Sequence, residues 1–485
     1  MTFYSFKDNP VEHQAQTDEI SFPKDNWYES ELSSVNIGDK RLNKRLVKIA
    51  SDLSSNITAP INQASGDWNS TKAAYSFFDN NKVSPDKILQ PHLENTAARM
   101  TNQKVVLAIQ DTTTINYASH EAVELGHIGK EGTSGLMQHN TLAVTPAGLP
   151  LGLIDQTCWS RPLTPEEKAI QDPVTIEEKE SFKWIVALRN TQLRSPASTK
   201  VVTVCDREAD IYEFFDEAET LDASVLVRLK HDRQIEESSS GVKSYLKSQD
   251  IVAQYKITVP KKWGKYEERT ATVVLRHTPV TINAPESIED DVTHMQIKMH
   301  AIYVEEINAP KDAIPSQWCL LINLPILSVS EAIEKVEWYK KRWMVEIFHK
   351  TEKSCCSIED CRLETAERLM NFLALKSIIA WRVLFMTYIN RQEPQAPAQL
   401  ILSPTEITVL ENVISKKCKT KIKKIKTVRQ AVSAVASLGG HLNRKTDKNP
   451  GIITVCRGIQ RLNDFSDGFV AAKLSIIESK RNTYG

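Results

Sequence analysis

The sequence predicts an α/β core in which acidic residues follow buried strands, with helical segments before and after it. Residues 105–109 and 201–205 are continuous apolar runs, which are typical of strands buried on both faces of a sheet. The first run leads into Asp111, and the second ends directly before Asp206. The third observation is a charged stretch far downstream that contains Glu346.

Length and composition indicate a globular chain of several domains. Its 485 residues exceed one ordinary core, so we expect two to four domains. Hydrophobic residues make up 41% of the chain, which argues against disorder. The formal net charge is zero, but cations are bunched locally, so nucleic acid is not excluded as a partner. Because residues 1–25 are polar and no run of 18 apolar residues occurs, we expect neither a signal peptide nor a membrane span.

The eight cysteines are scattered along the chain. Cys355, Cys356 and Cys361 cluster, but neither a C-x2-C pair nor partner histidines accompany them, which argues against a zinc site. We therefore expect reduced intracellular thiols.

A helical segment with a cationic face is predicted within residues 1–84. Apolar residues recur at helical spacing after Asp39, a candidate helix cap. A second helix is predicted around 71–78 and contains Lys72. Five cations fall within nine residues of the first helix: Lys40, Arg41, Lys44, Arg45 and Lys48. Such a face suits contact with a phosphate backbone, or is simply solvated, and the segment alone leaves both readings open.

Further elements complete the core predicted over 85–392. In order they are a β-hairpin (142–144 and 151–154), a helix (163–195), a strand (225–228), a β-rich insertion (about 231–325) and an apolar helix (367–390). The hairpin is predicted by the proline and glycine between its arms. The insertion is predicted by apolar runs that no helical period of useful length interrupts.

The charged stretch over 338–353 has the spacing Y-x2-R-x3-E-x6-K. At about 100° per residue, a continuous helix would place its four members within an arc of roughly 60°. They are Tyr339, Arg342, Glu346 and Lys353. A carboxylate can hold a divalent metal, and arginine and lysine can hold phosphate. The alternative is a solvated face of salt bridges.

A Pro-containing linker over 391–397 separates a smaller helical region, predicted over 393–485. This region contains a basic run between Lys416 and Arg429. A run of that density is typical of a solvated or nucleic-acid-facing loop.

The order of these elements is that of the ribonuclease-H-like fold. Acids stand on the first and fourth strands, a hairpin lies between them, and a late helix adds a glutamate. Two metal ions about 4 Å apart require several carboxylates that converge on one point. Such a site activates a water or a 3′-hydroxyl for in-line attack on phosphorus.

Several stretches resemble those of the DDE transposases of bacterial insertion sequences in the insertion-sequence-four family. Residues 110–114 resemble the first-aspartate motif, 204–211 the second, and 339–353 the Y-R-E-K signature. Shorter matches stand at 158–162, 438–440 and 468–473. The resemblance extends from about Trp27 to Lys473. It implies a ribonuclease-H-like catalytic domain with a β-rich insertion, between helical DNA-binding and dimerisation domains.

The resemblance also implies roles for site residues. Asp111, Asp206 and Glu346 would be the catalytic triad and the ligands of Mg²⁺, with Mn²⁺ as a substitute. It further implies an enzyme of cut-and-paste transposition: strand nicking, hairpin formation and resolution, and strand transfer to target DNA. Two alternatives are a metal-dependent nuclease without strand joining and a non-catalytic DNA-binding regulator.

Candidate DNA contacts near the cut are Tyr339, Arg342 and Lys353, which the resemblance assigns to phosphate binding. Trp318 stands 21 residues before Tyr339, where the family carries a tryptophan that stabilises a flipped base. The alternative for Trp318 is core packing, because apolar residues follow it.

Contacts with the ends of the element are expected from the helical N-terminal domain, through Arg41, Lys44 and Arg45. Arg228 and Lys230, around the end of the strand at 225–228, are further candidate DNA contacts. The expected partners are double-stranded DNA, both terminal inverted repeats and target, and a second copy of the chain in a paired-end complex. We expect a bacterial cytoplasmic protein that joins the nucleoid when bound to DNA.

Overall fold

The computed structural model describes residues 26–129, 133–161, 175–259, 268–311, 313–417 and 424–483. These residues form two compact units. The first contains Lys104–Asp111 and the chain from residue 173 to Trp343, and the second contains residues 18–103, 112–172 and 344–485. This division by contacts does not test the three predicted domains, 1–84, 85–392 and 393–485, which stay a prediction.

Some predicted features lie outside the described residues. They are the N-terminal tail (1–25), the first part of the helix predicted over 163–195, and the lysines at 419, 421 and 423 of the basic run. The described part of that helix is α7 (Phe182–Arg194), preceded by a short 3-10 turn at Ile176–Glu178.

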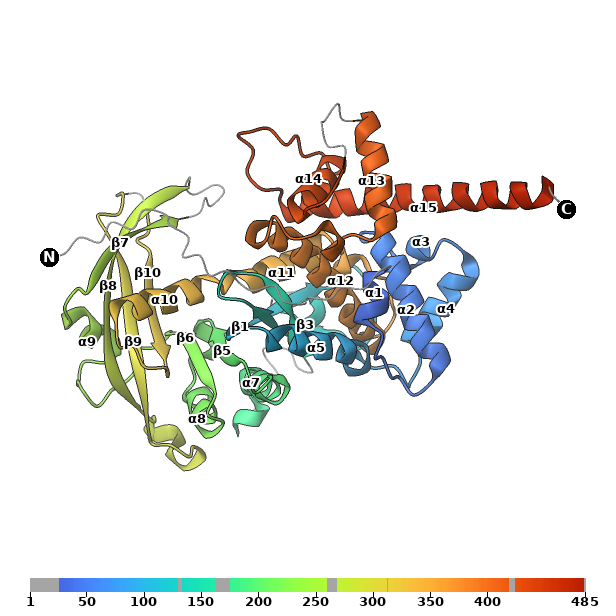
Figure 1. The fold of residues 1–485 in the computed structure, drawn as a ribbon. Helices are drawn as coiled ribbons and strands as arrows, with labels where there is room; N and C mark the ends of the chain where they lie inside the picture. The colour runs from blue at the N-terminus through green and yellow to red at the C-terminus, as the bar shows by residue number, and fades with distance from the viewer. Residues whose placement is uncertain are drawn as a thin grey trace. The chain divides into compact units, whose positions relative to one another are not determined.

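The first unit is built on a mixed sheet (Figure 1). Its parallel part has the order β1 (Val105–Asn116), β5 (Lys200–Cys205), β6 (Ser224–Arg228). The sheet continues antiparallel through β10 (Gln317–Ile322), β9 (Gln296–Ile307), β8 (Arg269–Asn283) and β7 (Ala253–Val259). The predicted buried strands are confirmed, because Val106, Ile109 and Val204 are fully buried.

Helices α7, α8 (Tyr212–Thr220) and α9 (Val242–Ser248) contribute apolar side chains to the core of this unit. Trp184 and Phe214 are among its largest buried side chains. The β-rich insertion is confirmed, but the sequence did not predict α9 within it. That helix buries only Val242 and Leu246, which is too short a pattern to reveal a helical period.

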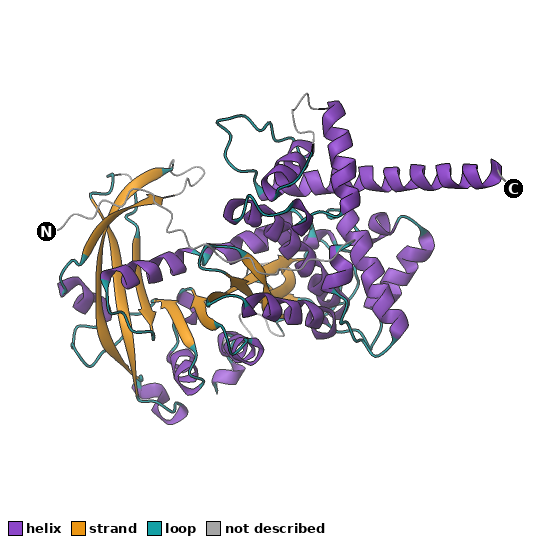
Figure 2. Cartoon of the chain, viewed as in Figure 1, coloured by secondary structure: helices purple, strands orange, loops and turns teal. Residues whose placement is uncertain are grey.

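The second unit is mainly helical in the described residues (Figure 2). It begins with α1 (Trp27–Glu31), α2 (Lys40–Ser55), α3 (Ile61–Ser65), α4 (Trp68–Phe78) and α5 (Pro85–Thr101). The predicted cap is confirmed, since the Asp39 carboxylate accepts a hydrogen bond from the Arg41 amide. The helix predicted around 71–78 begins three residues earlier, because Asp67 caps it at Trp68.

The predicted hairpin is confirmed and is longer than expected. Strands β3 (Ser134–Val144) and β4 (Pro150–Trp159) pair antiparallel, with β2 (Gly126–His127) beside β3. Gly148 has a φ of 103°, which glycine adopts readily in the turn. The extra length of β3 is residues 134–141, and its last four residues, Gln138–Thr141, carry buried polar side chains that a hydrophobicity pattern does not reveal.

The remaining helices are α10 (Val329–Lys340) in the first unit and α11 (Trp343–Ser354), α12 (Ala366–Gln392), α13 (Pro404–Lys417), α14 (Val428–Leu438) and α15 (Ile452–Thr483), which follow it. The signature stretch is therefore two helices rather than one. Because α10 ends at Lys340 and α11 begins at Trp343, the arc expected for a continuous helix is wrong. Tyr339 lies on α10, Arg342 in the break, and Glu346 on α11.

Among the described helices, one is long and apolar enough to cross a membrane, and this helix is α12. Its most apolar 18-residue window has a mean hydropathy of 1.6 although polar residues interrupt it, and the expectation that nothing spans a membrane stays a prediction. That window is 100% buried inside the structure, as in the core helix of a globular unit. Its length and composition are thus weak evidence of a span.

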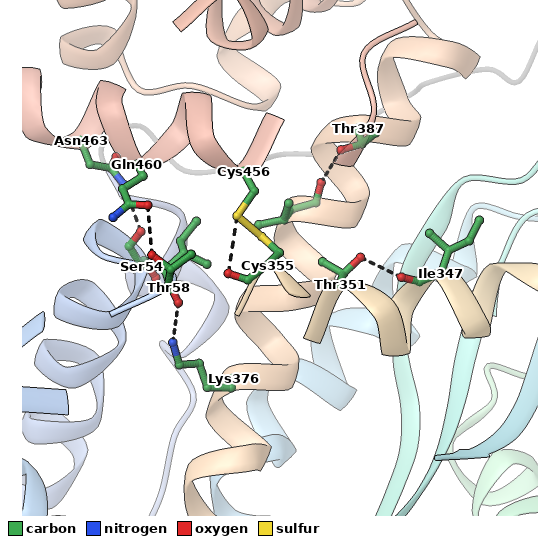
Figure 3. Close-up of a disulfide and its surroundings, with 12 residues drawn as sticks. Ser54, Thr58, Ile347, Thr351, Cys355, Lys376, Thr387, Cys456, Gln460 and Asn463 are labelled. Atoms are coloured by element: carbon green, nitrogen blue, oxygen red, sulfur yellow. Dashed lines mark hydrogen bonds between the residues drawn. A yellow bond between two sulfur atoms is a disulfide. The ribbon is translucent and has the colours of Figure 1, made fainter. Parts of the chain in front are cut away.

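Cys355, directly after α11, and Cys456 on α15 form a disulfide (Figure 3). The expectation that all thiols are reduced is therefore wrong for this pair. The two cysteines are 101 residues apart in the chain, so no local spacing could have indicated the bond. Cys356 and Cys361 are buried free thiols.

Candidate catalytic site

Two carboxylates stand just beyond the paired stretch of two neighbouring parallel strands in the first unit: Asp111 lies within β1, and Asp206 directly follows β5. The register pairs Ile109 of β1 with Val204 of β5, and its continuation by two residues sets Asp111 beside Asp206. Neighbouring strands are about 4.8 Å apart, so two such side chains can share one ion. The Asp206 carboxylate also accepts a hydrogen bond of 2.8 Å from the Glu208 amide, which holds the turn after β5.

Electrostatics in this corner support the same arrangement. Burial raises the pKa of the Cys205 thiol well above its ordinary value, and the negative charges of Asp206 and Asp111 raise it further. The positive charge of Arg342 opposes this shift. Arg342 Nη1 lies 3.4 Å from Asp111 Oδ2, and both side chains are largely buried.

These donors fit a hard divalent cation, because carboxylate oxygens at a strand edge are the ligands that Mg²⁺ and Mn²⁺ prefer. Within the described part of the chain, no group of three or more His, Cys, Asp and Glu side chains is close enough to hold a metal. The pair Asp111 and Asp206 lies within the first unit, whereas Glu346 belongs to the second. Its place beside the two aspartates stays a prediction.

Two arginines and a phenol surround the carboxylates in the first unit. Tyr339 is buried, and its phenol lies close to the guanidinium group of Arg228. Burial raises the pKa of Tyr339, while the charges of Arg342 and Arg228 lower it. Burial also lowers the pKa of Arg228. The structure thus brings together three of the predicted DNA contacts beside Asp206, and a cluster with two guanidinium groups suits a phosphate.

Asp210 is a residue of this site that the sequence reasoning missed. Its buried carboxylate accepts hydrogen bonds from the amides of Lys230 (2.6 Å) and His231 (2.9 Å) and from Arg233 Nε (2.6 Å). It therefore ties the turn after Asp206 to the loop that follows Arg228. The only sign of Asp210 in the sequence was its position four residues after Asp206. Its hydrogen-bond donors stand about twenty residues further along the chain.

Trp318 lies on β10, opposite Val304 of β9. Its side chain is partly exposed, whereas Leu320 and Ile322 on the same strand are fully buried. The indole is therefore not part of the buried core, which weakens the core-packing alternative.

The other predicted contacts lie in the second unit. Glu346 and Lys353 are partly exposed and seven residues apart on α11, so they share one face of it. On α2, Arg41 and Lys44 are exposed and Arg45 is partly exposed. The α2 helix buries Leu46 and Ile49 on its other side, which leaves a cationic face in solvent.

Three family models match the chain in order. A model for transposase DNA-binding matches residues 24–83, and a model for the transposase DDE domain matches residues 179–382. A model for the transposase Tn5 dimerisation domain matches residues 378–478. The DDE match contains Asp206 and Glu346, while Asp111 precedes it.

The DNA-binding match covers the cationic helix α2, and the dimerisation match covers α13, α14 and most of α15. The DDE match covers the parallel strands β5 and β6 and the signature residues, and such domains work with divalent metal ions. The chain belongs to the Tn5-like DDE transposases, enzymes that cleave DNA and transfer its strands.

Proposed function

We propose that the protein moves an insertion sequence by cut-and-paste transposition. It nicks each end of the element, forms and resolves a hairpin, and joins the released ends to target DNA. The observation that carries this proposal is the pair Asp111 and Asp206, just beyond the paired stretch of β1 and β5 and beside the guanidinium groups of Arg228 and Arg342. Carboxylates for a metal and cations for a phosphate are the two needs of phosphoryl transfer.

Asp111, Asp206 and Glu346 would hold Mg²⁺, with Mn²⁺ as a substitute. When bound, the metal supplies the charge that activates the attacking oxygen and stabilises the leaving oxygen. Arg342 and Arg228 bind phosphate oxygens, and the Tyr339 phenol lies beside both guanidinium groups. Because these groups are largely buried, their attraction for a phosphate is stronger than it would be in water.

Trp318 offers a place for the base that hairpin formation takes out of the helix. Moving a base out of the stack costs a few kcal/mol, and stacking on an aromatic ring returns roughly 1–3 kcal/mol. The partial exposure of the indole supports this role, since a buried ring could not receive a base. Lys353 contacts a phosphate near the same cut.

Recognition of the element ends falls to the cationic face of α2, through Arg41, Lys44 and Arg45. The DNA is the terminal inverted repeat of the protein's own element, and the target is a second duplex. Two copies of the chain hold the two ends through the dimerisation region. The protein works in the bacterial cytoplasm and joins the nucleoid when it is bound to DNA.

Incubation with DNA tests this proposal. Purified protein is mixed with Mg²⁺ and a duplex that carries the boundary of its own gene, and the products are run on a denaturing gel. We expect a nick at one position, followed by a hairpin of twice the strand length. Cleavage without positional preference, or none at all, would refute the proposal. An Asp206→Asn preparation serves as the control for a contaminating nuclease.

A further inference from the structure

Helix α11 is fastened to the core of the second unit by a ladder of buried polar side chains. His349 and Glu352, one turn apart on α11, face Asn140 and Gln138, two residues apart on β3. Gln138 Nε2 donates to Glu352 Oε1 at 3.0 Å, and Asn140 Nδ2 lies 3.1 Å from His349 Nε2. All four side chains are buried. Residues three apart on a helix and two apart on a strand lie on one face of each element, so α11 and β3 make two successive polar contacts.

A second layer closes the ladder from β4 and α12. Ser377 Oγ donates to Glu352 Oε1 at 2.6 Å. Gln156 Nε2 donates to Asn140 Oδ1 and to Ser377 Oγ, each at 2.7 Å. Glu352 Oε1 thus accepts two hydrogen bonds, one from Gln138 on β3 and one from Ser377 on α12.

An apolar contact would hold α11 as well, but with less control over its rotation. Hydrogen bonds are directional, and buried polar groups are costly unless every one finds its partner. A rotation of α11 by a fraction of a turn would break the contacts of both His349 and Glu352. The same rotation would redirect Glu346 and Lys353, the two signature residues on this helix.

We propose that Glu352 is a positioning residue for the transposase reaction, which fixes the rotation of α11 through Gln138 and Ser377 and so the direction of Glu346. This inference rests on the proposed function, because it gives Glu346 a catalytic task. Glu352 stands within the x6 interval of the signature pattern, where no role has been assigned to it.

The buried surroundings of Glu352 favour its protonated form. Its second oxygen, Oε2, has no hydrogen-bond partner among the described residues, and the same holds for Gln138 Oε1 and Gln156 Oε1. The cluster therefore has a surplus of acceptors, and a carboxylic acid adds a donor where a carboxylate adds none. Burial raises the pKa of Glu352 to about 7, although hydrogen bonds from Ser377 and Gln138 and the charge of Lys353 lower it.

Other titratable groups face Glu352 from the surrounding elements. They are Lys353 and His349 on α11, Cys158 on β4, Tyr117 after β1 and Cys356 after α11. Burial raises the pKa of the Cys158 thiol and that of the Tyr117 phenol, so both are neutral near pH 7. On α12, Lys376 directs its ammonium to the Ile57 carbonyl. The His349 imidazole is present in both wild type and Glu352→Gln, so a comparison of the two proteins isolates the ionisation of Glu352.

The test compares end-specific nicking by the full chain and by Glu352→Gln between pH 6 and 8.5. The amide keeps the accepting oxygen but cannot ionise. Because the pH dependence of the attacking oxygen is common to both proteins, the ratio of wild-type to variant rate isolates Glu352. We expect this ratio to fall about eightfold between pH 6.5 and 8, as the protonated fraction of a group with a pKa of about 7 does. A ratio that is constant with pH overturns the inference.

Two further variants separate positioning from folding. Glu352→Ala should nick at least about tenfold more slowly at pH 6.5 while Glu352→Gln stays near wild type, both measured well below their melting temperatures. Equal rates for folded Glu352→Ala and wild type would overturn the inference. Glu367→Gln, which neutralises an exposed carboxylate on α12, is the matched control and should leave the ratio flat. Wild type that fails to nick at any pH would instead refute the proposed function.

Discussion

Arg342 Nη1 lies 3.4 Å from Asp111 Oδ2, so an arginine of the signature stretch forms an ion pair with the aspartate on β1. The two residues are 231 positions apart, and the break between α10 and α11 brings the arginine to β1. This contact joins the two halves of the predicted chemistry within one unit. The carboxylates for the metal and the cations for the phosphate form one electrostatic cluster.

The first prediction concerns the triad. Asp111→Asn, Asp206→Asn and Glu346→Gln should each lower nicking by more than about a hundredfold in Mg²⁺, because each removes a charged ligand. Binding to the element end, measured by gel shift, should survive in all three. Glu208→Gln is the matched control. Glu208 stands two residues after Asp206, but its side chain is exposed and forms an ion pair with Lys183. A triad variant that nicks at the wild-type rate would exclude that residue from the metal site.

The second prediction concerns the cationic face of α2. Arg45→Ala should bind the element end more weakly and reduce the slope of log affinity against log salt by about one, because one phosphate contact is lost. Lys200→Ala is the control. It removes one positive charge at the first residue of β5, outside α2, and should leave both the affinity and the salt slope unchanged. If Arg45→Ala keeps the wild-type salt slope, another surface reads the DNA.

The third prediction concerns Trp318. Because the indole is partly exposed, Trp318→Ala should keep its melting temperature close to that of wild type and nick normally. Hairpin formation should slow, and Trp318→Phe should fall between the two, since a smaller ring retains part of the stacking. All three quantities are measured on one preparation. A lower melting temperature with nicking and hairpin yield reduced in parallel would return Trp318 to the core.

The fourth prediction concerns dimerisation. Phe469 on α15 is 40% exposed, within the region that matches the dimerisation domain. Phe469→Asp should bind a single DNA end as wild type does and form fewer paired-end complexes on a native gel. A point variant is preferable to truncation, because α14 and α15 pack against α12 and their loss would expose its apolar surface. Ser475→Asp adds the same charge elsewhere on α15. Undiminished pairing in Phe469→Asp would place the interface elsewhere.

The fifth prediction concerns the disulfide between Cys355 and Cys456. A bond that closes a loop of about 100 residues stabilises a chain by up to about 4.7 kcal/mol in the chain-entropy account. Cys456→Ser, or reduction of the wild type, should therefore lower the melting temperature, while Cys158→Ser should not. Equal melting temperatures with and without reductant would show that the bond contributes no stability.

Local patterns in the sequence predicted much of the first unit. The apolar runs of β1 and β5 and the acids after them carry their own signal, because a strand buried on both faces is continuous in hydrophobicity. That Asp111 and Asp206 stand side by side depends on the pairing of strands 95 residues apart in register. Only the resemblance to a known layout predicted that pairing.

Other features leave no local signal. The break at Lys341 and Arg342 interrupts a stretch that reads as one helix. In the sequence, Gln138 and Asn140 look like surface residues because they are polar. They are buried in the structure, where Glu352 and His349 are their hydrogen-bond partners. In the same way, the groups that donate hydrogen bonds to Asp210 follow it by about twenty residues in the chain. Such contacts are decided by tertiary packing, which overrides the preference of each residue taken alone.

The central claim is that this chain joins DNA as well as cutting it. The most direct measurement incubates the protein and Mg²⁺ with precut element ends and a supercoiled plasmid, and sequences the junctions that form. We predict junctions between the 3′ end of the element and plasmid DNA, dependent on Asp111, Asp206 and Glu346. Ends that are nicked at the correct position but never joined to the plasmid would contradict the account and identify a nuclease.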